Sequence, residues 1–543
     1  MSVHAATGAT QRSSPLTMKT AVLPAPVAGI DGRLNLSSNN PLNAVYAYNL
    51  VPSEYGLRSR LGFREWGINL ETAPSAGVGV RTIVPYTGTS GLSSNRLFAT
   101  TNEGIWDVSD ATDAPSLALA FGDTTGDAGW GNFASYTTDA GDELVFYADE
   151  TNGLFQYSPA LDTWAVSTGI TGVDPADVVF VVVHKQRIWL VERNTPVAWY
   201  LPVASISGEA KKFSFGAKFR HGGDLVGLFN WTIDGGSGVD DYLVAVSRGG
   251  DVLPYRGDDP SASFTWEGAG TFFVGRLPAG RRCAAEDGGD LHLLCDTGLI
   301  SLSDLLKGNI ANAEGEEINL KIARFLRTDM EVLSQERGWG INLNPNEGSV
   351  LVSTPVRAAN GYIQYTYNYA VTGWGQWRDV PGQVFQTWAG GMMVGTADGR
   401  VLRMDVTLDN VPYAGGTGGL PVAFSVLQNY TDAGAPGVFK YPKFVRPNFL
   451  AQQEVQITTK LLYDYNVSAM LPAPSAPAVS STDLWDTGLW DGAVWASGDL
   501  VNQTVTRGAW GRGRAVAVAM RGECRTRSTL ISTDIMWTAA GPF

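Results

Sequence analysis

Short apolar runs separated by polar or glycine turns recur from about residue 80 to residue 412. In each case a run of β-type alternation reaches a turn rich in Asn, Asp, Thr or Gly, and a second apolar run leaves it. This arrangement is typical of β-hairpins. Seven segments follow the pattern: 96–108, 143–157, 187–201, 241–255, 290–302, 349–367 and 392–404.

The spacing of these hairpins predicts a repeat architecture. Successive turns lie about 49 residues apart on average, close to the ~40–50 residues of one propeller blade. A four-stranded blade cannot bury both of its faces alone, so blades stack around an axis. We therefore predict a mainly β protein with a β-propeller of six or seven blades over residues 79–412, and an array of β-sandwiches is the alternative. The turn positions used are Gly104, Gly153, Asn194, Gly249, Gly298, Gly361 and Gly399.

One segment inside the predicted propeller departs from the β pattern. Residues 316–339 place apolar side chains at helical spacing, which predicts an amphipathic helix near 316–335. Such a helix would pack on the propeller's own face or be offered to a neighbouring subunit. The apolar stripe consists of Ile318, Ile322, Phe325, Leu326, Met330 and Leu333.

The two ends of the chain form flanks around the predicted propeller. Residues 1–20 are polar and are interpreted as a flexible tail. In the N-terminal flank, residues 21–78, Asn40 before Pro41 predicts the start of a short helix, followed by a hairpin. Residues 413–543 open on a Gly-rich linker and continue as a C-terminal β domain that completes a β-rich platform with the N-terminal flank.

The amino-acid composition is typical of a β-rich chain and argues against one class of function, the gripping of nucleic acid. The 543 residues include 64 glycines and only 17% charged residues, with a net charge of −14. A protein that grips nucleic acid needs clustered Lys and Arg to release counterions, and this balance argues against such a role. An acidic surface suits solubility, or a surface that DNA must pass without sticking.

Candidate catalytic and metal-binding groups are sparse. The cysteines form no metal-binding or disulfide framework, which predicts free thiols in a reducing compartment. The four histidines are scattered, and no G-x-S-x-G, H-E-x-x-H or P-loop pattern occurs. We expect no enzymatic activity, no cofactor and no metal. Two Asp/Gly-rich stretches, 234–242 and 287–296, could offer oxygen ligands to calcium but are better explained as hairpin turns.

The sequence also carries no membrane or secretion signal that we recognise. The N-terminus lacks an apolar core of the kind found in signal peptides. The longest apolar run, residues 178–183, has strand length and is too short to span a bilayer.

The C-terminal flank contains a tryptophan run, "LWDTGLWDGAVW", with Trp485, Trp490 and Trp495 at intervals of five. WD repeats place Trp-Asp once per blade, so the spacing excludes them. Residues five positions apart do not lie on the same face of a helix or of a strand. The spacing of the three tryptophans therefore favours a chain that bends at Gly488 and Gly492. The rings would then anchor in separate pockets of the subunit's own flank, in a neighbouring subunit or docked fibre, or serve as a sugar platform.

Both flanks resemble one family of virion proteins. The stretch at 23–63 is similar to the N-terminus of tail nozzle, or tail tubular, proteins of short-tailed bacteriophages. The family pattern "N-x-x-P…R-x-G-F" is matched by Asn49, Pro52, Arg60, Gly62 and Phe63. The C-terminal segments 434–450, 482–495 and 532–537 are similar too. The family's usual Trp-Phe before the hairpin proline is replaced by Leu50 and Val51.

The resemblance implies a structural subunit of a short phage tail, made in the host cytoplasm and assembled into the virion tail. Such subunits form a homohexameric ring below the head-to-tail adaptor, dock tail fibres or spikes, and surround double-stranded DNA during ejection without sequence-specific binding. Intersubunit contacts are expected from Trp485, Trp490, Trp495, Arg60 and Phe63. Acidic residues lining the channel would repel DNA phosphates.

A second class of function stays open from the sequence. The chain could be a glycan-binding or glycan-cleaving β-propeller on a virion or cell surface. That function requires a cleft with aromatic platforms and, for hydrolysis, a carboxylate pair, and no pair among the 53 acidic residues stands out.

Overall fold

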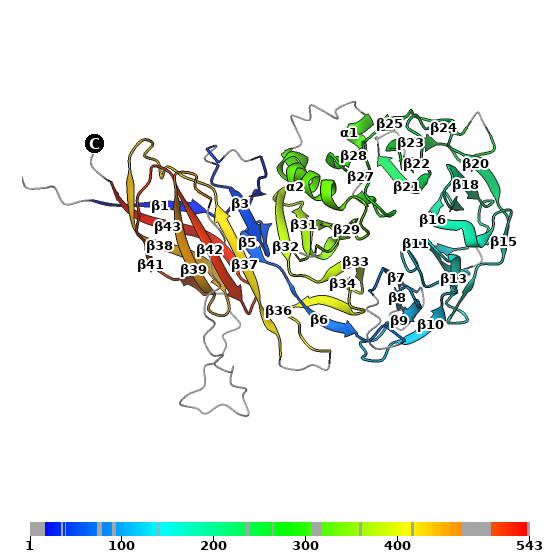
Figure 1. Cartoon of the computed structure of the whole chain (residues 1–543), viewed down its shortest axis with the longest axis horizontal. Helices are drawn as coiled ribbons and strands as arrows, with labels where there is room; N and C mark the ends of the chain where they lie inside the picture. Colours follow the sequence, from blue (N-terminus) through cyan, green and yellow to red (C-terminus); the bar gives the residue numbers. More distant parts are fainter. Residues whose placement is uncertain are drawn as a thin grey trace, which may run out of the picture.

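The computed structural model places a β-propeller beside a β-rich flank domain (Figure 1). Within the described ranges, strands dominate and only two α-helices occur, α1 (Leu302–Leu306) and α2 (Glu317–Leu333). The residues described are 17–33, 36–37, 40–72, 79–88, 94–138, 141–234, 239–262, 265–287, 289–306, 317–357, 361–413, 418–467 and 501–539.

The propeller is a ring of small antiparallel sheets around one axis. Six of these sheets belong to the propeller alone, and a seventh continues into the flank. Their first strands adjoin one another in chain order and close a circle, β7–β11–β16–β21–β26–β29–β33 and back to β7. Each blade buries its faces against its neighbours, as the repeat pattern predicted.

The strands of the first four blades are β7 (Thr82–Tyr86), β8 (Arg96–Thr100), β9 (Gly104–Asp107), β10 (Ser116–Ala120); β11 (Gly131–Thr137), β12 (Glu143–Asp149), β13 (Gly153–Ser158), β14 (Thr163–Val166); β16 (Val178–His184), β17 (Arg187–Glu192), β18 (Val197–Tyr200), β20 (Lys211–Ser214); β21 (Leu225–Asp234), β22 (Val239–Ser247), β23 (Asp251–Arg256), β24 (Glu267–Gly268) and β25 (Phe272–Phe273). Between blades lies a parallel pair, β15 (Ile170–Thr171) and β19 (Gly208–Glu209).

The remaining blades are β26 (Ala284–Asp287), β27 (Asp290–Cys295), β28 (Gly298–Ser301); β29 (Gly340–Asn344), β30 (Ser349–Ser353), β31 (Ile363–Asn368), β32 (Gly373–Arg378); and β33 (Gly382–Trp388), β34 (Gly391–Thr396), β35 (Val401–Val406), β6 (Gly62–Gly67). The last blade takes its outer strand, β6, from the N-terminal flank. The ring is therefore closed by pairing between segments far apart in the chain.

All seven predicted hairpins are present, and each forms the second and third strands of one blade. The Asp/Gly-rich stretches at 234–242 and 287–296 fall where β21 pairs with β22 and β26 pairs with β27, both antiparallel; residues 235–238 and 288 lie outside the described residues. The prediction of a mainly β protein with a six- or seven-bladed propeller is confirmed.

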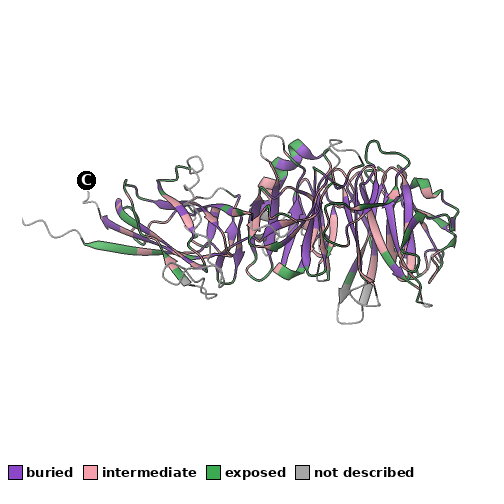
Figure 2. Ribbon diagram, turned by 90° about the horizontal axis from the view of Figure 1, so that it is seen from below, coloured by how far each residue is buried: buried purple, intermediate pink, exposed green. Residues whose placement is uncertain are grey.

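The flank is a sandwich built from both chain ends. One layer comprises β1 (Met18–Pro24), β4 (Leu50–Ser53), β5 (Gly56–Ser59), β38 (Lys440–Ala451), β40 (Val501–Thr504), β41 (Arg507–Gly508) and β43 (Thr529–Ala539). The other continues the sixth blade through β2 (Gly29–Ile30), β3 (Asn43–Tyr48), β37 (Leu420–Gln428) with β36 (Leu408–Asp409), β42 (Val516–Cys524) and β39 (Gln456–Tyr463). Seen from below, buried residues run through flank and propeller alike (Figure 2).

Helix α2 lies where the stripe of apolar positions predicted it. Ile322, Leu326, Met330 and Leu333 are buried in the core cluster that also holds residues of the flank and of the fifth and sixth blades. The helix therefore packs on its own chain, and the alternative of offering this stripe to a neighbouring subunit is wrong. The side chain of Ile318 lies outside the described positions.

Two local expectations at the N-terminus are wrong. The short helix expected from Asn40 and Pro41 is replaced by a turn and strand β3, which pairs with β37 on one side and with β2 and β32 on the other. Two-sided pairing outweighs the local capping signal. The tail predicted for residues 1–20 is also shorter, because Met18 already begins β1, which pairs along β43.

Candidate functional site at the junction and the propeller axis

Three side chains, defined here as the junction clasp, join the N-terminal flank to the strand that follows the propeller and, through Asn49, to the sixth blade: Asn49, Arg60 and Asp409. The Arg60 guanidinium donates to both carboxylate oxygens of Asp409 at 2.7 Å and to Asn49 Oδ1 at 3.0 Å. Only 1% of the Arg60 side chain is exposed. A buried, bidentate Arg–carboxylate pair fixes both position and orientation.

Asn49 is the centre of the clasp because its conformation and side chain serve three elements at once. Its φ of 60° is a left-handed value that Asn tolerates better than most residues. Its Oδ1 also accepts from the backbone N–H of Arg378 in the sixth blade, at 2.8 Å. Its Nδ2 donates to the carbonyl of Ala423 in β37, at 2.8 Å.

The other residues of the N-terminal pattern lie at the same junction. Phe63 is 2% exposed and packs in a cluster between the sixth and seventh blades. At Gly62 a Cβ would come within 2.1 Å of the carbonyl oxygen of Leu408, so the close approach requires glycine. Pro52 packs against Gly373 and Gly375 of β32, and at Gly373 a Cβ would lie 2.6 Å from the Val27 carbonyl oxygen. The residues of this N-terminal sequence pattern therefore meet at one junction in the structure.

These positions correct the expectation for Arg60 and Phe63. Both side chains are buried within the subunit, so they cannot contact a neighbouring subunit as the structure stands. The reason is that their partners, Asp409 and the blade residues, come from the far end of the chain and could not be paired with them from sequence. Trp485, Trp490 and Trp495 lie outside the described residues, and their expected interface role stays a prediction.

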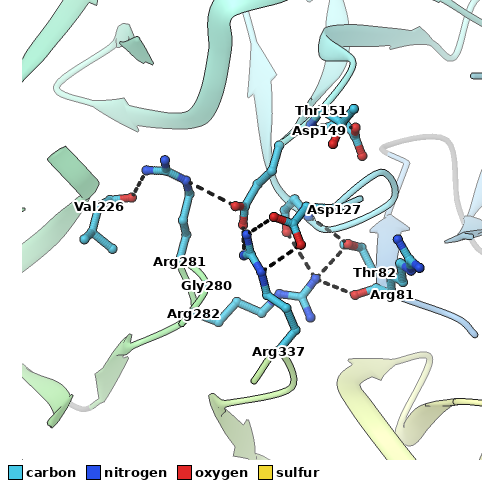
Figure 3. A network of polar contacts seen from close by, with 12 residues as sticks. Arg81, Thr82, Asp127, Asp149, Thr151, Val226, Gly280, Arg281, Arg282 and Arg337 are labelled. Carbon is cyan, nitrogen blue, oxygen red and sulfur yellow. Dashed lines mark hydrogen bonds and ion pairs between the residues drawn. The ribbon is translucent and has the colours of Figure 1, made fainter. Parts of the chain in front are cut away.

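The propeller axis is crossed by arginine side chains (Figure 3). Arg282, just before the fifth blade, donates to the carbonyl of Arg81 and to Thr82 Oγ1 at 2.7 Å, both at the first blade. It also lies over the Trp130 ring, 5.1 Å from the centroid. Loss of hydration lowers the pKa of Arg282 to about 10, which leaves the guanidinium charged at neutral pH.

Two further arginines complete this network, and with Arg282 they are called the axial arginines. Arg281 donates to the carbonyls of Leu225 and Val226 in the fourth blade, at 2.7 and 2.6 Å. Arg337, before the sixth blade, reaches across to Glu150 at 2.8 Å and to Asp127 at 2.7 Å in the second (Figure 3). The carboxylates of Asp127 and Glu150 are thus engaged in ion pairs with Arg337. Sequence periodicity missed these residues because they lie between strands.

His184 and His221 are held by neighbouring side chains of the fold. His184 and His292 lie in strands, as expected, and burial lowers the pKa of His184, whose Nδ1 is 2.9 Å from Asn230 Oδ1. His221 pairs with the fully buried Asp251 at 2.7 Å, an anchor between a loop and β23 that the sequence did not reveal.

The three cysteines are free and buried, and burial raises the thiol pKa of Cys283 to about 11 and of Cys524 to about 12. Within the described ranges, no group of three or more His, Cys, Asp or Glu side chains is arranged to hold a metal ion. Neither described helix has the length and apolarity needed to cross a membrane.

Comparison with known proteins identifies no family. No protein-family model matches the chain, and no curated protein matches it. Solved structures with likeness include the extracellular domain of a putative one-component system from B. thetaiotaomicron, with 13% identity and a TM-score of 0.38. That match covers 64% of this chain, which spans only 40% of the solved one.

Two further matches are equally distant. A computationally designed protein shares 8% identity at a TM-score of 0.33, covering 63% of this chain and 99% of its own. An exo-β-1,3-galactanase from Phanerochaete chrysosporium shares 10% identity at a TM-score of 0.28, and the match covers 74% of this chain and 95% of the galactanase chain. Such low TM-scores carry no functional argument. The chain's own topology defines its class, a β-propeller joined to a β-sandwich flank.

Proposed function

We propose that this chain is a structural subunit of a short phage tail, forming a ring that surrounds the DNA channel and docks fibres or spikes. The observation that carries the proposal is the junction clasp. Among the motif residues that resemble the nozzle family, Arg60 binds Asn49 and Asp409, while Asn49 and Phe63 contact the sixth and seventh blades. A subunit that must hold its propeller at a set angle to a ring needs such a joint.

The surface of the flank also supports an assembly role. Large apolar side chains are exposed there, with Trp510 at 87%, Val22 at 64% and Leu420 at 59%. Tryptophan is enriched among residues that carry the binding energy of interfaces. The backbone at Trp510 is anchored, since the Tyr463 hydroxyl donates to its carbonyl at 2.6 Å.

Charge is unevenly distributed, which modifies the expected acidic channel. Residues 413–543 contain ten Lys or Arg (Lys440, Lys443, Arg446, Lys460, Arg507, Arg512, Arg514, Arg521, Arg525, Arg527) and nine Asp or Glu (Asp432, Glu454, Asp464, Asp483, Asp486, Asp491, Asp499, Glu523, Asp534), so this flank is nearly neutral in a chain of net charge −14. A channel lined by this flank would therefore be nearly neutral rather than strongly acidic.

The alternative, a glycan-binding or glycan-cleaving propeller, is less well supported. The carboxylates of Asp127 and Glu150 at the axis are held by Arg337 and are not free as an acid/base pair. Release of reducing sugar from host surface polysaccharide, lost in a carboxylate variant, would establish this alternative instead.

The test of the structural role is oligomeric state. We expect negative-stain images of the purified full chain, or of virions, to show a closed ring with six-fold symmetry. Trp510→Glu should reduce ring formation, while Leu161→Glu, at a propeller residue that is 74% exposed, should not. A chain that stays monomeric at high concentration, with no ring in virions, would overturn the proposal.

A further inference from the structure

A cavity of about 450 Å³ lies where the flank, helix α2 and the sixth blade meet. We call it the junction cavity. Its wall is formed by β2 and β3 of the flank, by α2, and by β31 and β32. Binding sites occur preferentially at boundaries between structural units, and this volume falls within the ~300–1,000 Å³ of small-molecule sites. The residues used below are Asn43, Tyr48, Arg324, Asp329, Arg357 and Arg378.

Arginines give the cavity a positive character within an acidic protein. Arg324, Arg357 and Arg378 line it, against Asp31 and Asp329. Asp31 is held by Arg33, and Asp329 is held by Arg357 and by the Tyr365 hydroxyl, which donates at 2.8 Å. Arg378 forms no ion pair with any described residue.

The Arg378 guanidinium is held ready for an anion. It lies over the Tyr48 ring, 4.0 Å from the centroid, and Tyr48 stacks on Tyr46 with centroids 5.0 Å apart. The Arg378 Nε donates to Gln376 Oε1 at 3.4 Å, and stacking leaves the edge formed by the two Nη groups available for bidentate binding of a carboxylate.

Two residues that line the cavity, Asn43 and Arg357, each carry a buried polar atom without a hydrogen-bond partner. Asn43 is only 5% exposed, and its Oδ1 has no donor, while its Nδ2 is used by Asp31. The Nε of Arg357 has no acceptor. Unpaired buried polar groups are costly, so a ligand that satisfies them gains affinity. The needed ligand offers a hydroxyl to Asn43 and an anionic group to the arginines.

The cavity wall is fixed before any ligand binds. The backbone N–H of Gly32 donates to the Lys321 carbonyl at 2.7 Å, and the Lys321 ammonium donates to the Ala28 carbonyl at 3.1 Å. At Gly32 a Cβ would lie 2.8 Å from both that carbonyl and the Phe325 ring. Helix α2 therefore sits directly on the flank, and a pre-formed wall lowers the entropic cost of binding.

We infer that the junction cavity binds a hexuronate unit, with its carboxylate at Arg378 and Arg357 and a ring hydroxyl donating to Asn43. Neutral hexoses lack the anion that the arginines require, and sulfate lacks the hydroxyl that Asn43 requires. Inorganic phosphate carries both a negative charge and a hydroxyl at neutral pH, so it is the competitor that the titration must separate from a uronate. The inference does not rest on the proposed tail function, because it concerns the subunit alone.

The experiment is calorimetric titration of the full chain with D-glucuronate, D-glucose and inorganic phosphate, and with a uronate oligosaccharide to separate free sugar from polymer. Glucuronate should bind and glucose should not. Arg378→Gln should weaken glucuronate binding about tenfold or more, the loss expected for a charged hydrogen bond. Exposed Arg324→Gln, a change that folding tolerates, should weaken it less.

Arg403→Gln, in the last blade, is the matched control and should bind like the wild type. Phosphate binding as tight as glucuronate would overturn the sugar assignment, and so would equal binding by Arg378→Gln. Absence of glucuronate binding would overturn the inference entirely. Because ring formation is measured separately, failure here leaves the structural proposal intact, and the reverse also holds.

Discussion

At the scale of single residues, the junction clasp explains why a few widely spaced positions share one pattern. Asn49 and Arg60 form hydrogen bonds with Ala423 and Asp409, and Gly62 lies close to the Leu408 carbonyl, so all three meet residues that follow the propeller strands in the chain. Burial makes the Arg60–Asp409 pair sensitive to partial removal, because a single substitution leaves one charge unpaired.

We predict that Arg60→Met and Asp409→Asn each lower the free energy of unfolding by about 3–5 kcal/mol, as expected when a buried pair loses one partner. The double variant should lose less free energy of unfolding than the sum of the two single-variant losses, because each single substitution already removes the same Arg60–Asp409 interaction. Denaturant unfolding measures all three. The exposed pair Arg96–Asp162 is the control, with single-variant effects of about 1 kcal/mol or less. Strict additivity at Arg60 and Asp409 would contradict the role of the clasp.

The burial of His184 predicts that the free energy of unfolding depends on pH. Burial holds its folded-state pKa below the ordinary value of 6.5, so the unfolded chain binds the proton first as pH falls. Its contribution to stability is present above pH 6.5 and is lost as pH falls through the folded-state pKa. Wild type should therefore lose more unfolding free energy than His184→Asn between about pH 7.5 and pH 5. Parallel losses in the two proteins would refute this assignment.

At the scale of elements, α2 shows how a helix inserted into a β repeat becomes part of the core. Its buried face contacts the fifth and sixth blades, and its other side borders the junction cavity. Fixing this one helix therefore shapes both the propeller–flank join and the cavity.

Leu326→Ala should lower the unfolding free energy by about 2–5 kcal/mol, because Leu326 is completely buried and the substitution leaves a cavity. The exposed neighbour Arg327→Ala should change it by about 0.5 kcal/mol or less. Thermal and denaturant unfolding would measure both, and equal effects would show that the helix contributes no core packing.

At the scale of the whole molecule, two of the axial arginines join blades that are not neighbours in the ring. Arg282 links the fifth blade to the first, and Arg337 links the sixth to the second. Arg282→Gln should lower the unfolding free energy by at least about 1.5–3 kcal/mol, the range for one charged hydrogen bond.

Hydrogen exchange gives the spatial check on Arg282→Gln. Faster exchange is expected in β7 and β11, on the far side of the axis from the substitution. Arg256→Gln, at an exposed strand end, is the control and should leave exchange unchanged. Loss of protection confined to the fifth blade would contradict a tie across the axis.

The tryptophan run also belongs to this scale. If its rings anchor the ring-forming flank, Trp490→Ala should impair folding or assembly and leave any measured catalytic rate without a specific loss. Sedimentation of the variant beside wild type tests this, and full assembly of Trp490→Ala would contradict it.

Much of the fold could be predicted from the sequence because the signals for hairpins and for the helix are local in the chain. Alternation around Gly and Asp turns identified seven hairpins, and their near-constant interval indicated the propeller, since every blade must bury the same two faces. The apolar stripe of α2 followed from helical periodicity for the same reason. The strand at Asn43–Tyr48 was missed because partners on both sides, not its own residues, determine it.

Only the tertiary structure decided how distant segments meet. The closure of the ring by β6, the pairing of Arg60 with Asp409, and the reach of Arg282 across the axis all join positions separated by hundreds of residues. A single sequence carries no record of such pairings, because any of many arginines could meet any of many carboxylates. The sequence by itself determined the repeating unit, and long-range burial and charge pairing determined where the units join.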